Sequence, residues 1–362
     1  MTEVTSRPAP LGTRLFPPRA QALPEIVTLA VAAGGGIGFT LAGIPGGALS
    51  GAMLAVAIAA AAGIAAPVSL GTRIAAMAVS GLSVGSAASP ETVRNIVTYP
   101  ASILVMALAV YATTAASALM SVWLSRWSRT TAVLAAVPGA MSYVLSLAMT
   151  PGLKADVPQI VVVQMGRLLF LVAGVPLLIA ESGTHLAPLA FTRTDPYWMV
   201  AAMLPATALA GWLFHRFKVA GGVMFGSLLV SAALHATGVA PGRVPPPVMI
   251  TGQILIGAWA GSRFVGFDWE LLFRSMKGAL AAIGAAMVVA LGFAAFGAGV
   301  LHLPFAATLL AYAPGGLEAM TMLAFGLSVD PLFVAAHHFA RVIVINFSMP
   351  FVMKHWAQTP EK

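Results

Sequence analysis

The chain has 362 residues, of which 59% are hydrophobic and 8% charged, and its formal net charge is +8. Apolar runs of membrane length recur along the whole chain, which excludes an ordinary soluble enzyme and predicts an all-α, polytopic membrane protein. The chain has no cysteine, so disulfides and thiolate metal sites are excluded. It also has no basic soluble module for nucleic acid, and we assign the positive charge to loops that flank membrane segments.

Five regions are expected in chain order. Residues 1–24 contain Pro and Arg without the apolar core of a signal peptide, and predict a short cytoplasmic tail. A first membrane repeat is expected at 25–180, a polar connector at 181–196, a second membrane repeat at 197–353, and a cytoplasmic tail at 354–362. Each repeat holds six apolar segments.

The two halves of the chain repeat one another most clearly at their ends, over 138–176 and 314–350. Each stretch opens on a Pro-Gly break, continues through an Asp and an Arg that are eleven residues apart, and closes on a Pro. The aligned polar pairs are Asp156 with Asp330, Gln164 with His338, and Arg167 with Arg341. Internal duplication of this kind is common among secondary transporters.

Loop charge indicates how the halves are oriented. If all six segments cross the membrane in each half, ten Lys and Arg residues fall on the side of the N-terminus and seven on the other. If the fifth segment of each half is re-entrant, the halves are inverted and the ratio is fourteen to three. The second ratio fits the positive-inside rule far better. We therefore expect two inverted repeats, about ten transmembrane helices plus two broken or re-entrant segments, and both termini in the cytoplasm.

The break in each fifth segment has its own physical argument. Pro138-Gly139 and Pro314-Gly315-Gly316 remove a backbone donor and loosen the chain where a helix should continue. Irregular backbone at membrane depth survives only when it is buried in protein or lines a wet cavity. Matching interruptions in the two halves therefore indicate a transport site, with Gly139, Gly315 and Gly316 exposing backbone groups.

The arginines lie near the middle of membrane-length helices. Placing Arg167 or Arg341 there costs about 2.5–3.5 kcal/mol or more, so each must face the protein interior or water. One interpretation is a buried tie to Glu318 or to carbonyls that the breaks leave free. The other is a clamp for an anion, and both can hold together.

The remaining polar residues also have two interpretations each. Gln164 and His338 lie one turn before the arginines, where they are satisfied core groups or, for His338, a proton relay. Asp330, and more loosely Asp156, are helix caps or proton and ion sites. Glu318 either favours a helix start or couples protons.

Two further patterns are less specific. Gly46-Gly47 and Gly221-Gly222 either allow close helix packing or help to hold an anionic group at a helix start. The adjacent pair His337-His338 is not a metal motif, because neighbouring helix positions face different directions.

These motifs resemble the AbrB family of bacterial membrane proteins. The resemblance rests on PGGLEAMTMLAFGLSVDPLFVAAHHFAR, which runs from Pro314 to Arg341, and on GIPGGALSGAML, and it covers about 26–353. It implies a multi-pass protein of the inner membrane. Family members are labelled as ammonia monooxygenases, regulators of gene expression or transporters. The first half departs from the pattern, with Ser142-Tyr143 where the second half has Glu318-Ala319.

The favoured hypothesis is a secondary transporter for a small anionic or zwitterionic solute, with no catalytic residue, cofactor or metal. The solute would meet Arg167, Arg341, Gln164, His338 and the glycines of the breaks, and protons or sodium would couple through Glu318, Asp330 or Asp156. The alternative is a membrane sensor or accessory protein that regulates gene expression indirectly. A membrane monooxygenase is the third possibility, but the scattered histidines offer no clustered ligands for copper or iron. The lipid bilayer is an expected partner, nucleic acid is not, and a homo-oligomer stays open.

Overall fold

The structure is a computed structural model that describes residues 19–90, 99–138, 141–150, 153–181, 193–217, 219 and 221–356. These residues form fourteen α-helices: α1 (Arg19–Leu41), α2 (Gly47–Ala61), α3 (Leu70–Gly85), α5 (Tyr99–Ser125), α6 (Arg129–Ala136), α7 (Met141–Ala148), α8 (Val157–Glu181), α9 (Tyr197–Arg216), α10 (Gly222–Ala236), α11 (Pro246–Ser262), α12 (Trp269–Val300), α13 (Phe305–Tyr312), α14 (Leu317–Gly326) and α15 (Pro331–Trp356). Within those ranges the only β pairing is an isolated bridge between Thr194 and Arg243. The expected all-α class is confirmed.

Membrane-length helices dominate the described part of the chain. Six of them, α1, α5, α8, α9, α12 and α15, are long and apolar enough to cross a membrane. Large apolar side chains on their outer faces are exposed, including Leu41, Trp123 and Phe347. Lipid is the solvent that such surfaces require, so the chain is a multi-pass membrane protein.

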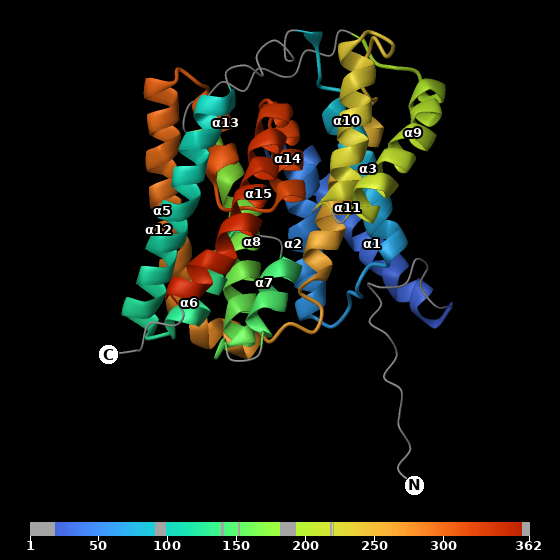
Figure 1. The fold of residues 1–362 in the computed structure, drawn as a ribbon. Helices are drawn as coiled ribbons and strands as arrows, with labels where there is room; N and C mark the ends of the chain where they lie inside the picture. Colours follow the sequence, from blue (N-terminus) through green and yellow to red (C-terminus); the bar gives the residue numbers. More distant parts are fainter. Residues whose placement is uncertain are drawn as a thin grey trace.

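The helices pack as two bundles, and each bundle contains helices from both halves of the chain (Figure 1). The first bundle, on the right of the view, holds α1–α3 and α9–α11, with α2 packed on α11 and α10 packed on α3. The second bundle, on the left, holds α5–α8 and α12–α15, with α5 running along α12. The corresponding helices of the two halves therefore make corresponding contacts.

Glycines let the crossed helices of the first bundle touch through their backbones. A Cβ added at Gly81 of α3 would lie 2.2 Å from the carbonyl oxygen of Met224 on α10. A Cβ added at Gly257 of α11 would lie 2.7 Å from the carbonyl oxygen of Leu49 on α2. Small residues that admit a neighbouring backbone are the usual means of helix association in membranes. The same device thus holds the two equivalent contacts.

A buried pair ties the start of the second half to α10. His235 Nε2 lies 3.0 Å from Asp195 Oδ2, and both side chains are 1% exposed. The other oxygen, Asp195 Oδ1, accepts a hydrogen bond from Gly242 N at 2.7 Å. The end of the connector is therefore anchored before α9 begins.

Two pairs of short helices replace the fifth segments. The eight-residue helices α6 and α7 flank the first break, whereas α13, with eight residues, and α14, with ten, flank the second. The first pair lies in the lower part of the second bundle and the second pair in its upper part (Figure 1). In both places the chain is interrupted where the sequence predicted it.

The two short pairs differ in how deeply they are packed. α14 contacts α2, α3 and α11 of the first bundle, and eight of its ten residues are buried. α7 contacts mainly α6 and α8, and of its described side chains only Val144 and Ala148 are buried. A stack of Phe225 on Phe339, with ring centroids 3.9 Å apart, joins the bundles beside α14.

Candidate functional site

Arg167 of α8 is bound to the first break. Its Nη1 donates to Ala136 O at 2.8 Å and its Nη2 donates to Val137 O at 3.2 Å. These carbonyls end α6, where no further helical N–H can reach them. A cation at a helix C-terminus is also favoured by the helix dipole. Arg167 is 6% exposed, and its guanidinium hydrogen-bonds mainly to backbone oxygens that the break leaves free.

Arg341 of α15 makes the equivalent contacts with the second break. Its Nη1 donates to Ala313 O at 2.8 Å, and its Nη2 donates to Gly315 O. The side chain is 1% exposed. The sequence allowed the arginines to bind either Glu318 or backbone carbonyls that the breaks leave free. The structure shows hydrogen bonds to the carbonyls.

The polar residue one turn earlier repeats the pattern in both halves. Gln164 Nε2 donates to Leu134 O at 3.3 Å, and His338 Nε2 lies 2.9 Å from Leu310 O. Because a carbonyl only accepts, His338 Nε2 carries the hydrogen. Gln164 also accepts from Arg167 Nη2 through Oε1 at 3.4 Å. Each break is thus held by a matched pair of side chains from the following helix.

The two guanidinium groups have no carboxylate partner within the described residues. The ion pairs there are His235 with Asp195, and Arg274 with Glu270 at the surface. Both cations are buried in the second bundle, Arg167 on α8 and Arg341 on α15. Like charges in a medium of low dielectric repel strongly unless an anion joins them. The centre of the second bundle is therefore electropositive.

Unused polar atoms cluster at the second break. Thr321 Oγ1, His338 Nδ1 and Arg341 Nε are buried and have no hydrogen-bond partner among the described residues. Buried polar atoms without a protein partner are uncommon, and these three atoms are able to hydrogen-bond to a polar ligand. Thr321 was not singled out from the sequence, although it lies one turn after Glu318 on the buried face of α14.

The start of α14 offers backbone donors at the same place. Its N-cap is Gly316, which provides no side-chain cap, and the residue is exposed. The first N–H groups of a helix point outward and attract anions. Gly315 accepts a hydrogen bond from Arg341 through its carbonyl oxygen, and Gly316 is the residue at which α14 begins. Gly139 falls outside the described residues.

Glu318 forms no ion pair with the buried arginines among the described residues. Its Oε1 would lie 3.6 Å from a Cβ at Gly221, at the start of α10. The guanidinium of Arg263 lies 4.1 Å from the centre of the Trp259 ring, and that of Arg73 lies 5.3 Å from it. Glu318 thus lies at the start of α10, where α14 meets the first bundle.

Gly46 and Gly221 begin α2 and α10 with the same left-handed backbone, at φ 65° and 66°. A Cβ at Gly46 would lie 2.8 Å from Leu323 Cδ1, and one at Gly221 would lie 2.6 Å from Leu317 Cδ2. Both leucines belong to α14. The two glycines therefore shape the surface that receives α14, in agreement with the packing interpretation, and no anion contact is assigned to them.

The aspartates act as helix caps at exposed positions. Asp330 Oδ1 accepts from Leu332 N at 3.0 Å and from Phe333 N at 3.1 Å. Asp156 Oδ1 accepts from Gln159 N at 3.1 Å. These contacts satisfy donors at the starts of α15 and α8, as the capping interpretation predicted.

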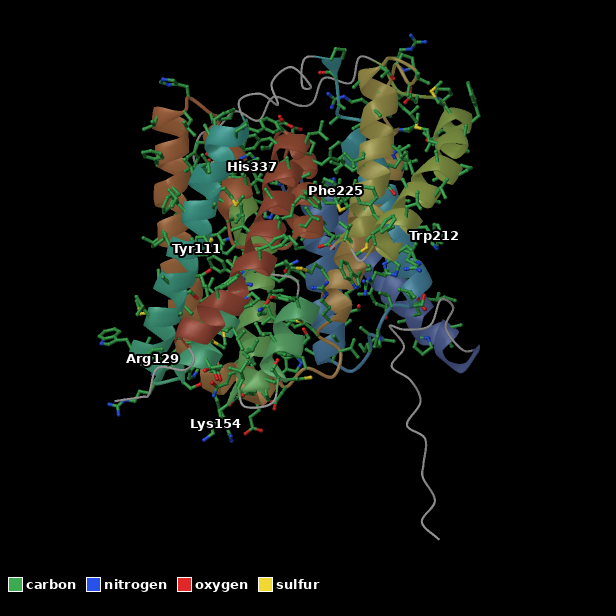
Figure 2. The ribbon with its side chains drawn as sticks, viewed as in Figure 1. Tyr111, Arg129, Lys154, Trp212, Phe225 and His337 are labelled. Carbon is green, nitrogen blue, oxygen red and sulfur yellow. The ribbon has the colours of Figure 1, made fainter. Side chains whose placement is uncertain are left out.

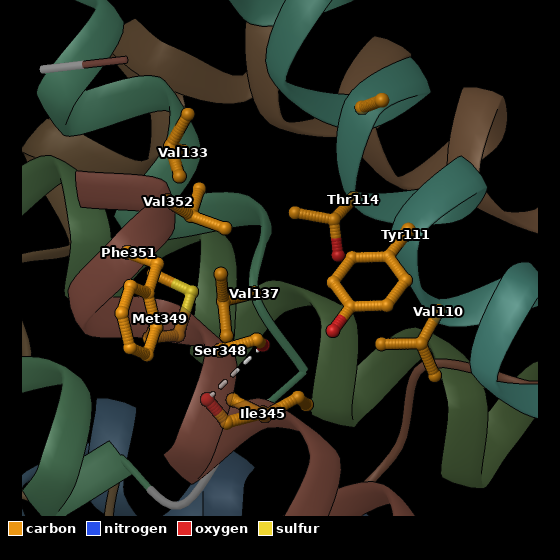
Figure 3. A pocket seen from close by; sticks show the side chains of 11 residues that line it. Val110, Tyr111, Thr114, Val133, Val137, Ile345, Ser348, Met349, Phe351 and Val352 are labelled. Carbon is orange, nitrogen blue, oxygen red and sulfur yellow. Dashed lines mark hydrogen bonds between the residues drawn. The ribbon is translucent and has the colours of Figure 1, made fainter. Parts of the chain in front are cut away.

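An apolar pocket of about 440 Å³ lies between α5, α6 and α15 (Figure 3). Its walls include Val110, Val133 and Met349, and its rim holds the exposed Tyr111 and Phe351. Val137, whose carbonyl binds Arg167, forms part of the wall. The pocket has almost no polar surface, so it does not suit the charged part of an anion.

The chain matches the model of one protein family. The model described as "Transition state regulatory protein AbrB" matches residues 48–357. Neither the curated proteins nor the solved structures give a match.

Proposed function

The chain belongs to the AbrB family, and from this premise and the geometry of the helix breaks we propose that it is a secondary transporter of a small anionic or zwitterionic solute. The solute would bind between the second break and α15. Arg341 and the N–H groups at the start of α14 would receive its negative group. Thr321 and His338 would complete its hydrogen bonds.

One observation carries this proposal: two guanidinium groups are buried in the second bundle with no carboxylate partner among the described residues. The carbonyl ends of α6 and α13 each contribute about half a negative charge, which offsets only part of the two positive charges. Leaving a net charge in a membrane interior costs several kcal/mol. An anionic solute would remove that cost, and this gives the site a reason to bind one.

The proposed topology is two inverted repeats with ten spans and two re-entrant breaks. Two features support it: α6–α7 and α13–α14 lie in opposite parts of the second bundle, and helices of one half contact the equivalent helices of the other. α1 begins and α15 ends at the lower edge of the view in Figure 1, and Arg129 and Lys154 lie at that edge in Figure 2. We assign this edge to the cytoplasm of a bacterium whose inner membrane holds the protein.

Movement of one bundle against the other would give alternating access. The second bundle carries both breaks and both arginines, whereas the first presents the glycine surface that receives α14. Transporters with repeated halves commonly work by such rocking around a fixed site. α14 would then undock as α7 docks, which exposes the site to the opposite side.

A thermal-shift screen tests the proposal. The purified protein is heated with mono- and dicarboxylates, phosphate, sulfate and amino acids, at one pH above and one below about 6.5, the pKa of a free histidine. A ligand at a hundredfold excess over its Kd stabilises a protein by about 2.7 kcal/mol. We expect at least one anion to stabilise wild type and the Arg274→Ala control but not Arg341→Ala, with Arg341→Lys between them. Equal stabilisation of Arg341→Ala and wild type would contradict the proposal.

A second candidate rests on the description of the family model, which names a regulatory protein. In that case the membrane bundles would sense a solute and pass the signal to a partner. Solute flux in proteoliposomes separates the two candidates. A reproducible partner in crosslinking, with ligand binding but no flux, supports the sensor.

A further inference from the structure

His337 is a buried titratable residue that the proposed solute site does not use. It lies on α15 four residues before Arg341, which is about one helical turn, and it is fully buried. Its Nδ1 lies 2.7 Å from Phe333 O, and its Nε2 lies 2.8 Å from Ser102 Oγ on α5. Both ring nitrogens therefore have partners, and Figure 2 places the residue inside the second bundle.

The contacts of Ser102 allow His337 to hold or release a proton without moving. Phe333 O only accepts, so Nδ1 keeps its hydrogen in either state. Ser102 Oγ lies 3.0 Å from Tyr99 O as well as close to Nε2. When the imidazole is neutral, the Ser102 hydroxyl donates to Nε2. When it is protonated, Nε2 donates to Ser102 Oγ, and the hydroxyl turns toward Tyr99 O.

Asp330 and Tyr99 are the titratable groups on the side of His337 toward the start of α15. Asp330 is exposed and precedes His337 by seven residues, about 10.5 Å along the helix. Tyr99 packs its ring against His337 with centroids 5.9 Å apart, and its buried hydroxyl has no hydrogen-bond partner among the described residues. Although Asp330 is exposed, the surrounding chain desolvates it and raises the pKa of its carboxyl, while the N–H groups of Phe333 and Leu332 act against that rise.

The other groups that face His337 lead toward the solute site. Tyr312 of α13 packs beside it and donates to Ser102 O at 3.2 Å. On α15 itself, His338 and Arg341 are the nearest titratable neighbours. The titratable residues of the other helices packed against α15 lie elsewhere: Glu318 lies at the start of α10, Arg73 lies over Trp259, and Arg129 lies at the lower edge of Figure 2.

The first half has no equivalent of this arrangement. Val163 occupies the position aligned with His337, and Ala136 occupies the position aligned with Tyr312. The matched pairs that hold the two breaks are duplicated, but the chain of hydroxyl and imidazole groups is not. A contact needed only to support a break would be expected in both halves. The contacts of His337 occur at the second break only, so we assign them to function and not to support of the break.

We propose that His337 is the proton-binding residue that drives solute movement, with Ser102 exchanging its hydrogen bond as the imidazole gains or loses the proton. This rests on the proposed transport function. The neutral imidazole takes one proton from water at Nε2 and later returns it to water, so the step needs no other reactant. The protonated ring adds a positive charge one turn from Arg341, which raises the affinity for an anion and links the two binding events.

The test needs no solute. Proteoliposomes adsorbed on a solid-supported membrane are given a pH jump, and the displaced charge is recorded. We expect a transient in wild type and in the His215→Gln control, whose histidine is exposed on α9. His337→Gln is expected to lose the transient. Ser102→Ala is expected to lose most of it, and Ser102→Thr, which keeps the hydroxyl, is expected to retain it.

The outcomes separate this inference from the transport proposal. A wild type without a transient, or a His337→Gln protein with the wild-type transient, overturns the role of His337. If His337→Gln does not fold, the two Ser102 variants provide the test. Equal transients in Ser102→Ala and Ser102→Thr would overturn the role of His337. The anion-dependent thermal shift of His337→Gln, measured beside these records, reports on the solute site alone. A lost transient with a retained shift supports the inference, and a normal transient with no anion shift in wild type contradicts only the solute site.

Discussion

The two helix breaks are built from the same chemistry but packed differently. Arg167 and Arg341 each donate to carbonyls at the end of a short helix, and Gln164 and His338 each bind the preceding turn. Yet α14 is buried between the two bundles, whereas α7 has only two buried residues among its described side chains. The two halves therefore share the hydrogen bonds that hold each break, but they differ in how the short helix after the break is packed.

This difference indicates which features are structural and which are functional. A tie that appears in both halves is needed wherever a helix is interrupted, because freed carbonyls must be satisfied. The partnerless atoms of Thr321, His338 and Arg341 lie on α14 and α15, and His337 of α15 has no counterpart at the aligned position Val163. Binding and coupling are therefore expected on the side where α14 is docked.

The largest expected effect comes from removing the arginines. Arg341→Ala leaves the carbonyls of Ala313 and Gly315 without their charged donor, and hydrogen bonds to charged groups are worth about 1.5–3 kcal/mol each. We expect both Arg341→Ala and Arg167→Ala to lose about 3 kcal/mol or more of unfolding free energy. Only Arg341→Ala should abolish the anion-dependent thermal shift.

Thermal unfolding in detergent checks this, with Arg274→Ala as the matched control. Arg274 pairs with Glu270 on an exposed face, and both side chains are more than 70% exposed. Equal loss of the anion shift in Arg167→Ala and Arg341→Ala would show that the two breaks share the solute.

The glycines of the first bundle should behave alike in the two halves. Gly81→Ala and Gly257→Ala each push a methyl group into a neighbouring backbone, and overpacking costs about 1–3 kcal/mol. We expect losses that agree within about 1 kcal/mol. Retention on size-exclusion chromatography and thermal unfolding provide the measurement. A large difference between the two variants would mean that the equivalent contacts are not equally strained.

The sequence predicted more of the local chemistry than of the packing. The breaks, the arginines near them and the capping aspartates follow from the types of residue and their spacing, because each rule concerns neighbours along one helix. Deep burial of α14 does not follow. The short helices, and the fourth apolar segment of each half (α5 and α12), show no periodic pattern that predicts which helices they pack against. His337 was visible as one of an adjacent pair, but Ser102 lies 235 residues away, and no spacing rule connects them.

Docking of α14 can be tested at the glycines that receive it. Gly46→Ala and Gly221→Ala add a methyl group beside Leu323 and Leu317 at a positive φ. Gly238→Ala is the control, because its φ is +78° and nothing lies within 4 Å. The strained backbone costs about 1–2 kcal/mol in all three, and we expect about 1 kcal/mol more at the two docking positions.

A labelling experiment reports the same step directly. The chain has no cysteine, so a single cysteine in place of Ala319 on α14 reacts alone with a maleimide. We expect faster labelling in the Gly46→Ala and Gly221→Ala backgrounds than with Gly238→Ala. Identical rates in all three would mean that these glycines do not control docking.

The smallest effect on stability is expected at Thr321. Thr321→Val removes a buried hydroxyl that has no partner, so unfolding should change by less than about 1 kcal/mol or become slightly harder. The anion-dependent thermal shift should fall, whereas Thr321→Ser should retain it. A fall in stability with an unchanged anion shift would remove Thr321 from the site.

Counterflow of the stabilising anion in proteoliposomes tests the account most directly. Liposomes loaded with the unlabelled anion are diluted into the labelled anion, and its accumulation is compared among wild type, Arg341→Lys, Arg341→Ala and Arg274→Ala. The account predicts accumulation in wild type and Arg274→Ala, a reduced level in Arg341→Lys and none in Arg341→Ala. Wild-type accumulation by a folded Arg341→Ala protein would contradict it.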